Sequence, residues 1–344
     1  MPDSLVARLD PHDYAAIARY VLSAPVWHWI QSGAGAESAS DNEAAFTRRR
    51  LRPRVLVDVS AVNVATSVLG SRLDLPVMIA PMGLQKAAHP DGELAMADGA
   101  ARAGSLLCVA VNAHTSVEDI AAAQPNLPLW FQLYNWGDRD ALATVIGRAE
   151  SAGCKAIVPL VNTAVDVNHS PLQIGFRPPP GASFAHFDAG YDNTSSNTWE
   201  YLDWLRSVTS LPIVPKGIMT GDDAARAVDR GAAGIIVSNH GGRQLPRSIS
   251  TLDALADVVA GAGGRAEVYL DGGVRTGTDV LIALGLGARA VFVGRPAMWG
   301  LAVGGAEGVA RVLDTLRDEL AADAGLCGIT EIGAVPADTV VGVA

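Results

Sequence analysis

Residues 234–245 read Gly-Ile-Ile-Val-Ser-Asn-His-Gly-Gly-Arg-Gln-Leu, an apolar run that ends abruptly in polar residues and glycines. The β-branched residues at its start are typical of a strand buried on both faces. His240 and Arg243 therefore follow a strand end, where a titratable base and a permanent cation share a glycine-rich loop. Taken alone, the stretch fits a plain strand-to-helix turn with surface polar residues equally well.

Seven further apolar runs repeat this pattern along the chain. They alternate with helix-like stretches rich in Ala, Leu, Asp and Arg, and they lie at 77–80, 106–111, 129–131, 156–160, 213–214, 268–270 and 290–293. Eight strands separated by helices within about 220 residues match a (β/α)8 barrel, whose chemistry gathers at the carboxyl ends of the strands. We therefore predict an α/β fold of the (β/α)8 TIM-barrel class.

The residues at these strand ends are polar, charged or glycine more often than turns alone require. Besides His240 and Arg243, they are Pro81, Met82, Gly83, Gln132, Tyr134, Asn162, Lys216, Asp271, Gly272, Gly273, Gly294 and Arg295. In a barrel such positions converge on one mouth. The pattern predicts an active site there.

The length of 344 residues exceeds a minimal barrel by about a hundred, which leaves room for an N-terminal extension and one long loop. We expect a single domain, with an N-terminal helical extension at 1–75, the barrel at 76–300 and C-terminal helices and a tail at 301–344. Helical spacing predicts helices at 10–22, 87–103, 117–123 and 201–208 and another from Thr220. Residues 164–198, after the fourth strand, are rich in Pro, Gly, Asn and Ser and favour a lid.

Trp27 and Trp29 lie beside a glycine cluster in the N-terminal extension. They either plug the bottom of the barrel or face a pocket at its top. Because a large aromatic ring usually packs in a core, core packing is the default interpretation.

Composition excludes several classes of protein. With 49% hydrophobic and 18% charged residues, the chain is typical of a globular enzyme. A net charge of −10 argues against nucleic acid and anionic membranes as partners. Three cysteines without metal-ligand spacing predict reduced thiols, no metal site and a cytoplasmic protein. We expect no secretory signal and no membrane-spanning segment.

The loops after the seventh and eighth strands indicate an anion site. Each combines glycines with an arginine, Arg275 in one loop and Arg295 in the other. In a (β/α)8 barrel these two loops often bind phosphate through backbone N–H groups, and arginine forks match phosphate oxygens. Turn glycines and surface arginines explain one such loop easily but both together poorly.

Five motifs in this order resemble the FMN-dependent 2-hydroxy acid oxidase and dehydrogenase family, which includes glycolate, lactate and mandelate oxidising enzymes. The motifs are Ser-Asn-His-Gly-Gly-Arg-Gln-Leu at 238–245, Leu-Asp-Gly-Gly-Val-Arg-Thr-Gly at 270–277, Phe-Val-Gly-Arg-Pro at 292–296, Ile-Ala-Pro at 79–81 and Gln-Leu-Tyr at 132–134. The resemblance covers nearly the whole chain. It implies FMN in the barrel mouth, and tetramers or octamers as the expected assembly.

The resemblance also implies roles for individual residues. Pro81, Met82, Gly83, Gln132 and Lys216 would line the flavin ring, and Asp271, Gly272, Gly273, Arg275, Gly294 and Arg295 would complete the cofactor site, with the phosphate on its glycines and arginines. His240 would be the catalytic base, because imidazole titrates near the working pH. Lys216 would stabilise the reduced cofactor, Arg243 would hold the substrate carboxylate, and Tyr134 would hydrogen-bond to the substrate.

Departures from the family pattern gather on the expected substrate wall. Asn162 stands where the family has the Asp that orients the catalytic His, His169 aligns with a carboxylate-binding Arg, and Trp29 aligns with a substrate-binding Tyr. Ala110 and Leu160 replace two flavin-contacting hydroxyls, and Pro-Arg at 246–247 replaces Asp-Gly. The cofactor motifs and His240 are kept. We therefore expect redox chemistry on a bulky or aromatic small-molecule substrate, to which Trp29, Asn162, His169 and Arg243 would bind.

Three functional hypotheses remain open from the sequence. The first is oxidation of a bulky, mandelate-like 2-hydroxy acid, with the flavin reoxidised by dioxygen or a soluble acceptor. The second keeps FMN but changes the reaction, to amine or amino acid oxidation or to an oxidative decarboxylation. The third is a flavin-binding protein without catalysis, and the presence of His240, Arg243, Tyr134 and Lys216 counts against it.

Overall fold

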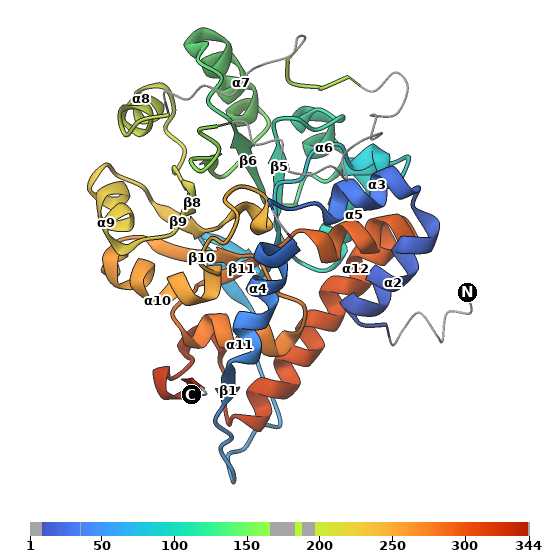
Figure 1. The fold of residues 1–344 in the computed structure, drawn as a ribbon, viewed down its shortest axis with the longest axis vertical. Helices are drawn as coiled ribbons and strands as arrows, with labels where there is room; N and C mark the ends of the chain where they lie inside the picture. The colour runs from blue at the N-terminus through green and yellow to red at the C-terminus, as the bar shows by residue number, and fades with distance from the viewer. Residues whose placement is uncertain (1–8, 35, 166–182, 188–196, 343–344) are drawn as a thin grey trace.

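The computed structural model describes residues 9–34, 36–165, 183–187 and 197–342. Eight parallel strands form its centre (Figure 1). In chain order they are β4 (Val77–Ile79), β5 (Leu107–Ala110), β6 (Leu129–Leu133), β7 (Ile157–Pro159), β8 (Lys216–Ile218), β9 (Gly234–Val237), β10 (Glu267–Asp271) and β11 (Ala290–Val293). β4 pairs with β11, and bridges from Ile157 to Ile213 and from Leu160 to Lys216 join β7 to the β8 segment. The sheet therefore closes, and the predicted (β/α)8 barrel is confirmed.

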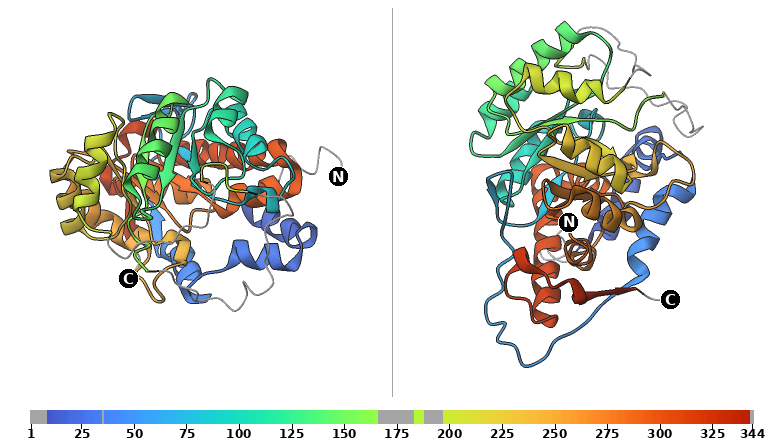
Figure 2. Two further views of the ribbon diagram at one scale, coloured as in Figure 1. Left: turned by 90° about the horizontal axis from the view of Figure 1, so that it is seen from above. Right: turned by 90° about the vertical axis from the view of Figure 1, so that its left-hand side faces the viewer.

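Helices surround the barrel (Figure 2). They are α5 (Gly92–Arg102), α6 (Val117–Ala123), α7 (Arg139–Ser151), α8 (Glu200–Val208), α9 (Gly221–Asp229), α10 (Thr251–Ala262), α11 (Gly277–Gly285) and α12 (Arg295–Leu326). The side chains of Ser116, Thr220, Ser250 and Thr276 each accept an amide hydrogen bond at the N-terminus of the helix that follows. Such caps satisfy otherwise unpartnered N–H groups and fix where these helices begin.

Strand residues point alternately into the barrel and toward the helices. The interior core contains Met78, Trp130, Ile236, Tyr269 and Phe292, all at most 1% exposed. The Trp130 ring meets that of Tyr269 edge to face, with 5.3 Å between centroids. Large rings therefore fill the barrel axis, and the open space lies beyond them at the strand ends.

The N-terminal extension packs along one side of the barrel, beside the C-terminal α12 (Figures 1 and 2). It contains α2 (Pro11–Val21), α3 (Ala24–Gln31), α4 (Ala36–Thr47), β1 (Arg49–Leu51), and the hairpin of β2 (Thr66–Val68) and β3 (Ser71–Leu73). β1 pairs antiparallel with β12 (Val340–Gly342), which ties the extension to the C-terminal segment. The predicted helix at 10–22 is confirmed, with Asp10 as its N-cap.

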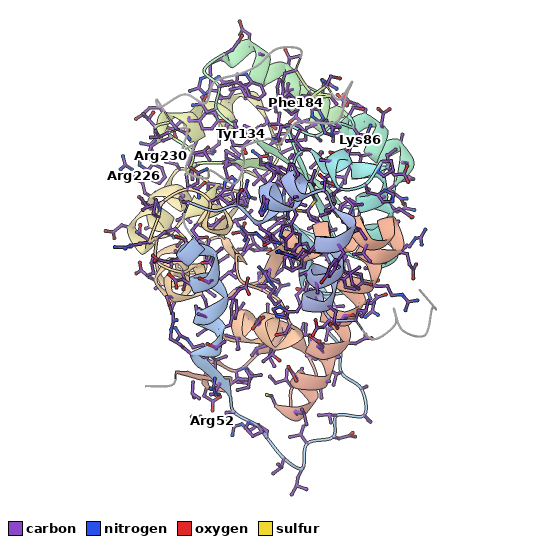
Figure 3. The ribbon with its side chains drawn as sticks, turned by 45° about the vertical axis from the view of Figure 1, so that its right-hand side comes forward. Arg52, Lys86, Tyr134, Phe184, Arg226 and Arg230 are labelled. Atoms are coloured by element: carbon purple, nitrogen blue, oxygen red, sulfur yellow. The ribbon has the colours of Figure 1, made fainter. Side chains whose placement is uncertain are left out.

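Four of the five arginines at 48–54 pair with carboxylates within the chain. Arg48 and Arg49 reach Asp253 at 2.5 and 2.8 Å, and Arg52 and Arg54 reach Asp338 at 3.2 and 2.5 Å. Arg52 is labelled near the lower end of the molecule in Figure 3. Arg50 donates only to the carbonyls of Thr47 and Arg49, so the stretch keeps an excess of positive charge.

Two predicted elements need correction. The fifth strand is assigned to Lys216–Ile218 rather than to 213–214, because Pro215 has no amide hydrogen and interrupts the ladder, so that Ile213 forms an isolated bridge. The first barrel helix begins at Gly92 rather than 87, after a short 3-10 turn at Gln85–Ala87. Pro90 explains the delay, since the residue before a proline avoids helical geometry.

Most of the predicted lid at 164–198 lies outside the described residues. In the part of the chain that the structure describes, no helix has the length and apolar character to cross a bilayer. Cys108, Cys154 and Cys327 are buried free thiols.

Candidate active site

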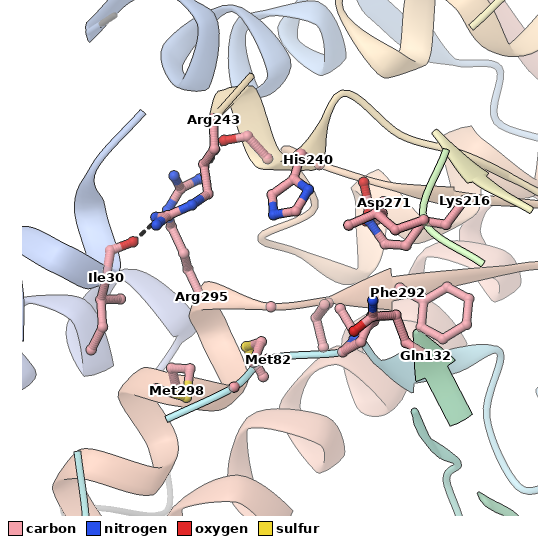
Figure 4. Close-up of a pocket in the computed structure, with 18 of the residues that line it drawn as sticks. Ile30, Met82, Gln132, Lys216, His240, Arg243, Asp271, Phe292, Arg295 and Met298 are labelled. Atoms are coloured by element: carbon pink, nitrogen blue, oxygen red, sulfur yellow. Dashed lines mark hydrogen bonds and ion pairs between the residues drawn. The ribbon is translucent and has the colours of Figure 1, made fainter. Parts of the chain in front are cut away.

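A cavity of about 270 Å³ opens at the carboxyl ends of the strands (Figure 4). The predicted site residues that line it are Trp29, Pro81, Met82, Gly83, Gln132, Tyr134, Lys216, His240, Arg243, Asp271, Gly272, Gly273, Arg275, Gly294 and Arg295. Their contributions come from both ends of the sequence and from six of the strands. Asn162 lies behind the described cavity wall, and His169 lies outside the described residues.

The cavity wall carries an excess of positive charge. Lys216, Arg243, Arg275 and Arg295 line it, whereas Asp271 is the only carboxylate among the described lining residues. Burial first, then the neighbouring Arg275 and Arg243, lowers the pKa of Arg295 to about 9. Gathered buried cations raise each other's energy, and a bound anion relieves that repulsion. The site is therefore built for a ligand with several negative charges.

Lys216 and Asp271 form a buried ion pair at the cavity floor. The Lys216 ammonium lies 2.5 Å from Asp271 Oδ2 and donates a second hydrogen bond to Ser238 Oγ at 2.7 Å. The second carboxylate oxygen, Oδ1, is buried without a partner among the described residues. A buried polar atom of this kind marks a place for a ligand donor.

His240 lies at the start of a short turn after β9, with a left-handed φ of 58°. Its amide donates to Ser238 Oγ at 3.1 Å, which fixes the turn. Burial, reinforced by Lys216, Arg243 and Arg295, holds the imidazole pKa well below its ordinary value of 6.5. His240 is therefore neutral at pH 7 and free to accept a proton.

Asn162 lies close to the His240 turn. Its Nδ2 donates to the Ser238 carbonyl at 3.1 Å, and its side chain packs on Gly217, where a Cβ would come within 2.6 Å of Asn162 Cγ. Asn162 Oδ1 and His240 Nδ1 are both buried without a partner among the described residues. Asn162 thus supports the turn from behind, and it carries no charge that would raise the pKa of His240.

Arg243 and Tyr134 stand at the outer part of the cavity. Arg243 Nη1 donates to the carbonyls of Trp29 and Ser32 at 3.0 and 2.9 Å, so both bonds engage one nitrogen of the planar fork. Burial raises the pKa of Tyr134 to about 12, and the opposing effect of Arg243 is smaller. Tyr134 therefore remains a neutral hydroxyl beside a guanidinium, a pair that recognises a carboxylate next to an oxygen.

Arg275 provides the second cationic centre, between the glycine loops. Its Nη2 contacts Glu43 Oε1 at 2.7 Å, its Nη1 donates to the Val274 carbonyl at 2.8 Å, and its Nε is buried without a partner among the described residues. The glycines beside it give a ligand room. A Cβ on Gly294 would meet nothing closer than Met82 Sδ at 3.6 Å, so that its space belongs to the cavity.

The residues present fit FMN. The phosphate has a cation with an unpartnered N–H at Arg275 and open space at Gly294. Across the cavity, Gln132 Nε2 is buried without a partner among the described residues, which suits the oxygen-rich edge of a flavin ring. Lys216 stands at the same floor. When bound, FMN supplies a two-electron acceptor.

Sequence reasoning missed part of the wall. Ile30, Leu84, Asn112 and Met298 also line the cavity. Asn112 follows β5, and a Cβ on Gly83 would lie 2.3 Å from its Oδ1, so that a polar residue after a strand end was the available signal. Trp29 packs partly against the core, as the default interpretation has it, and it also lines the cavity from α3.

A short described piece of the loop after β7 is anchored near the mouth. The amide of Val117 donates to His186 Nε2 at 3.0 Å, and His186 Nδ1 lies 2.8 Å from the Val111 carbonyl. Phe187 packs against Trp136, with ring centroids 5.3 Å apart. Figure 3 shows Phe184, from the same piece, above Tyr134. Trp136 thus holds the loop and is not among the described residues that line the cavity.

Fold and site together define a flavin-dependent oxidoreductase on a (β/α)8 barrel. The family model for FMN-dependent dehydrogenases matches residues 18–341. An L-lactate oxidase of a Nostoc species is 43% identical over 93% of this chain and 94% of its own length. A glycolate oxidase of Oryza sativa is 41% identical, over 96% of this chain and 95% of its own.

Solved structures of mandelate oxidase share the fold of this chain. A mandelate oxidase variant with (S)-mandelic acid has a TM-score of 0.91 and 38% identity, over 97% of this chain and 99% of that chain. Mandelate oxidase with (S)-2-phenylpropionate has a TM-score of 0.90 and 39% identity, over 95% and 97% of the two chains. The chain therefore belongs to the FMN-dependent dehydrogenase family, and it is an FMN-dependent enzyme of the 2-hydroxy acid oxidase class.

Proposed function

We propose that this enzyme oxidises the α-carbon of a bulky or aromatic 2-hydroxy acid to the 2-oxo acid. One observation carries the proposal. The indole of Trp29 and the side chain of Ile30 line the same cavity as Arg243 and His240. An anion-binding fork thus faces an apolar and aromatic wall, which suits a carboxylate with a large apolar substituent. The similarity to mandelate oxidase supports the same choice.

The substrate is held at two places. The Arg243 guanidinium binds its carboxylate, and the neutral Tyr134 hydroxyl hydrogen-bonds to the carboxylate or to the reacting oxygen. Trp29 packs against the substituent. The two carbonyls that accept from Arg243 fix the position of its guanidinium. Because a charged hydrogen bond weakens when its geometry is disturbed, this support keeps the substrate carboxylate aligned for reaction.

His240 accepts one of the two protons that the substrate loses. Its Nδ1 is buried, so Nε2 is the nitrogen that reaches the cavity. The low imidazole pKa keeps this nitrogen unprotonated at pH 7. FMN, when bound, would supply the acceptor for the other proton and both electrons, and dioxygen or a soluble acceptor would reoxidise it. The cations around the cavity, above all Lys216, favour the negative charge that the electrons bring.

The cofactor itself would lie across the cavity. Pro81, Met82, Gly83, Gln132 and Lys216 would line its ring, and Asp271, Gly272, Gly273, Arg275, Gly294 and Arg295 would complete the site, with the phosphate at Arg275 and the glycines. All of them line the cavity, which supports the assignment.

The test is anaerobic mixing of the flavin-loaded enzyme with (S)- and (R)-mandelate, lactate, glycolate and the matching amino acids. We expect mandelate to bleach the flavin absorbance with a second-order rate constant at least about tenfold higher than that of glycolate, a difference of about 1.4 kcal/mol. Efficient turnover of glycolate or lactate contradicts the proposal. Bleaching by amino acids alone would identify a changed reaction.

Trp29→Ala locates the specificity, with Trp27→Ala as its matched control. Both tryptophans lie on α3, but Trp27 lies by Arg19, 5.9 Å from guanidinium carbon to ring centroid, away from the described cavity wall. Trp29→Ala should raise KM for mandelate about tenfold or more and leave small hydroxy acids nearly unchanged, because it removes only the apolar contact. Trp27→Ala should change neither.

We also propose that the chain forms a homo-oligomer, a tetramer or octamer as in the family it resembles, and works in the cytoplasm. Val55, Leu56 and Val57 are exposed on the loop after β1, and exposed apolar residues that adjoin one another favour a protein contact. Light scattering on the purified enzyme tests the assembly, and a monomer at micromolar concentration would contradict it.

A further inference from the structure

Arg295 directs its guanidinium at the backbone of two other segments. Nε donates to the Ile30 carbonyl at 3.2 Å, Nη2 to the Ser32 carbonyl at 3.1 Å, and Nη1 to the Gly241 carbonyl at 3.1 Å. Figure 4 shows the contact with Ile30. Each of the three nitrogens therefore already has a carbonyl partner within the chain.

Two of these carbonyls belong to the C-terminal end of α3. A helix leaves its last carbonyls without partners, and α3 ends at Gln31 with Ser32, rather than a left-handed glycine, as its C-cap. Arg243 supplies the neighbouring contacts, from Nη1 to Trp29 and Ser32. Two cations thus cap one helix end, where the helix dipole favours positive charge.

The capped helix is short and depends on these contacts. α3 spans eight residues, and helices of this length are unstable in water without tertiary support. The amide of Ala34 donates to the Gly242 carbonyl at 2.8 Å, so the chain that leaves α3 is held on the His240 loop as well. Because Trp29 and Ile30 line the cavity, the position of α3 sets the shape of the substrate wall.

We propose that Arg295 is a positioning residue for substrate binding: it caps α3 and thereby holds Trp29 in the cavity wall. The inference rests on the proposed substrate site. Its contribution to the cofactor is limited to positive charge, and the hydrogen bonds of its guanidinium serve the substrate side. Arg275, with its unpartnered Nε, is then the arginine that binds the phosphate.

Arg295→Met separates the two roles. We expect the KM for an aromatic hydroxy acid to rise about tenfold or more with a smaller change in kcat, because the cap holds α3, and with it Trp29, in the cavity wall. The Kd of the apoprotein for FMN should rise clearly less than in Arg275→Met, which should raise it at least about tenfold, because Arg275 offers the phosphate an unpartnered N–H as well as its charge. Loss of FMN affinity in Arg295→Met with an unchanged KM overturns the proposal.

A second readout needs no turnover. Chymotrypsin cuts after tryptophan, and release of α3 exposes the bonds after Trp27 and Trp29. In the flavin-loaded Arg295→Met variant, cleavage there should be about tenfold faster than in the wild type. An unchanged rate contradicts the capping role whatever the substrate proves to be, so this result is independent of the proposed function.

Three further variants complete the test. Arg289→Met is the folding control, because Arg289 also donates to a backbone carbonyl, that of Ser67 in β2 at 2.8 Å, but at the opposite end of β11. It should leave FMN affinity, cleavage and KM unchanged.

Arg295→Lys keeps the positive charge but replaces the guanidinium with a single ammonium. It is the variant to use when Arg295→Met folds poorly, and its KM and cleavage rate should lie between those of the wild type and of Arg295→Met. Adding Arg295→Met to Trp29→Ala should raise KM little further, and independent multiplication of the two effects contradicts the proposal.

Discussion

The Lys216 ammonium and the Asp271 carboxylate lie 2.5 Å apart, with side chains only 5% and 9% exposed. The two residues come from β8 and β10, which flank β9 in the sheet. Ser238, at the end of β9, accepts a hydrogen bond from the same ammonium at 2.7 Å. Three neighbouring strands are thus joined at the cavity floor by one buried cation.

Removing one member of this pair should cost more than removing both. We expect Lys216→Met to lower the free energy of unfolding by about 3–5 kcal/mol, because it strands the Asp271 charge, whereas the double variant Lys216→Met/Asp271→Leu should recover much of the loss. Denaturant unfolding of the apoprotein measures both. The exposed pair Arg265 and Asp229, at 2.7 Å, is the control, and Arg265→Met should cost less than about 1 kcal/mol. Equal costs for the single and double variants would contradict this account.

The neutral state of His240 sets the acid side of the pH profile. Because the imidazole pKa lies well below 6.5, kcat/KM should hold as the pH falls through 6.5 and decline only at lower pH, where the base becomes protonated. Steady-state kinetics between pH 4.5 and 8 tests this, over a range within about two units of the ordinary imidazole pKa. A decline centred at or above 6.5 would disprove it.

Asn162→Asp should move that decline to higher pH. A carboxylate behind the His240 turn favours the protonated imidazole, and opposite charges at close range shift a pKa by about one unit or more. The new carboxylate also faces the Ser238 carbonyl, to which Asn162 now donates at 3.1 Å, so stability should fall by about 1–3 kcal/mol. Asn162→Ala keeps the site uncharged and should leave the pH profile in place.

Gly294 and Gly273 should respond differently to alanine. At Gly294 a Cβ has open space, with Met82 Sδ at 3.6 Å, so Gly294→Ala should leave apoprotein stability within about 1 kcal/mol and weaken FMN binding by filling the ligand's space. At Gly273, with φ of 87°, a Cβ would lie 2.2 Å from the Asn42 carbonyl oxygen. Gly273→Ala should therefore destabilise the apoprotein by more than about 2 kcal/mol. Thermal unfolding and FMN titration separate the two effects, and unchanged FMN affinity in Gly294→Ala would argue against a ligand there.

His186 should make the loop after β7 sensitive to acid. Its Nε2 accepts the Val117 amide, so Nδ1 carries the hydrogen that faces the Val111 carbonyl. Burial lowers the pKa below 6.5, opposed by that carbonyl and by Glu118 and Glu93, while Arg148 lowers it further. A folded pKa below the unfolded value gives stability that is complete above about 6.5 and is lost as the pH falls through the folded pKa.

Hydrogen exchange at the Val117 amide reports this directly. Protection should fall on going from pH 7 to pH 5 after correction for the intrinsic exchange rate, because a protonated imidazole has no acceptor to offer. His186→Leu should remove both the protection and its pH dependence. The Ala185 amide, which donates to the Ala113 carbonyl at 3.0 Å, should follow the same pH course in the wild type. Full protection of Val117 at pH 5 would refute the prediction.

The barrel could be predicted because each strand is a short apolar run bounded by turn residues. The runs at 234–237 and 290–293 match β9 and β11 residue for residue. The polar residues at the strand ends also converge on one cavity, since a closed parallel sheet places all its carboxyl ends together. The position of the cavity could therefore be predicted from the order of strands and helices alone.

Contacts between distant segments could not be predicted. Nothing in the local sequence shows that Arg295 meets carbonyls 263 and 265 residues away, because a backbone carbonyl leaves no residue signature. The same holds for Trp29, whose apolar ring suits a core and a cavity wall equally well. Pro215 and Pro90, in contrast, are visible in the sequence, and the backbone restrictions of proline are sufficient to predict the interruption before β8 and the late start of α5.

The proposed substrate wall and the polar floor of the cavity come from separate parts of the chain. α3 brings Trp29 and Ile30 from outside the barrel, whereas Lys216 and Asp271 stand on β8 and β10 and His240 stands on the turn after β9. Exchange of residues 24–34 for the matching segment of a relative should therefore change the substrate preference and leave Lys216, His240 and Asp271 in place. Arg243 and Arg295 can hold such a segment whatever its side chains, because they donate hydrogen bonds to main-chain carbonyls, which every sequence provides.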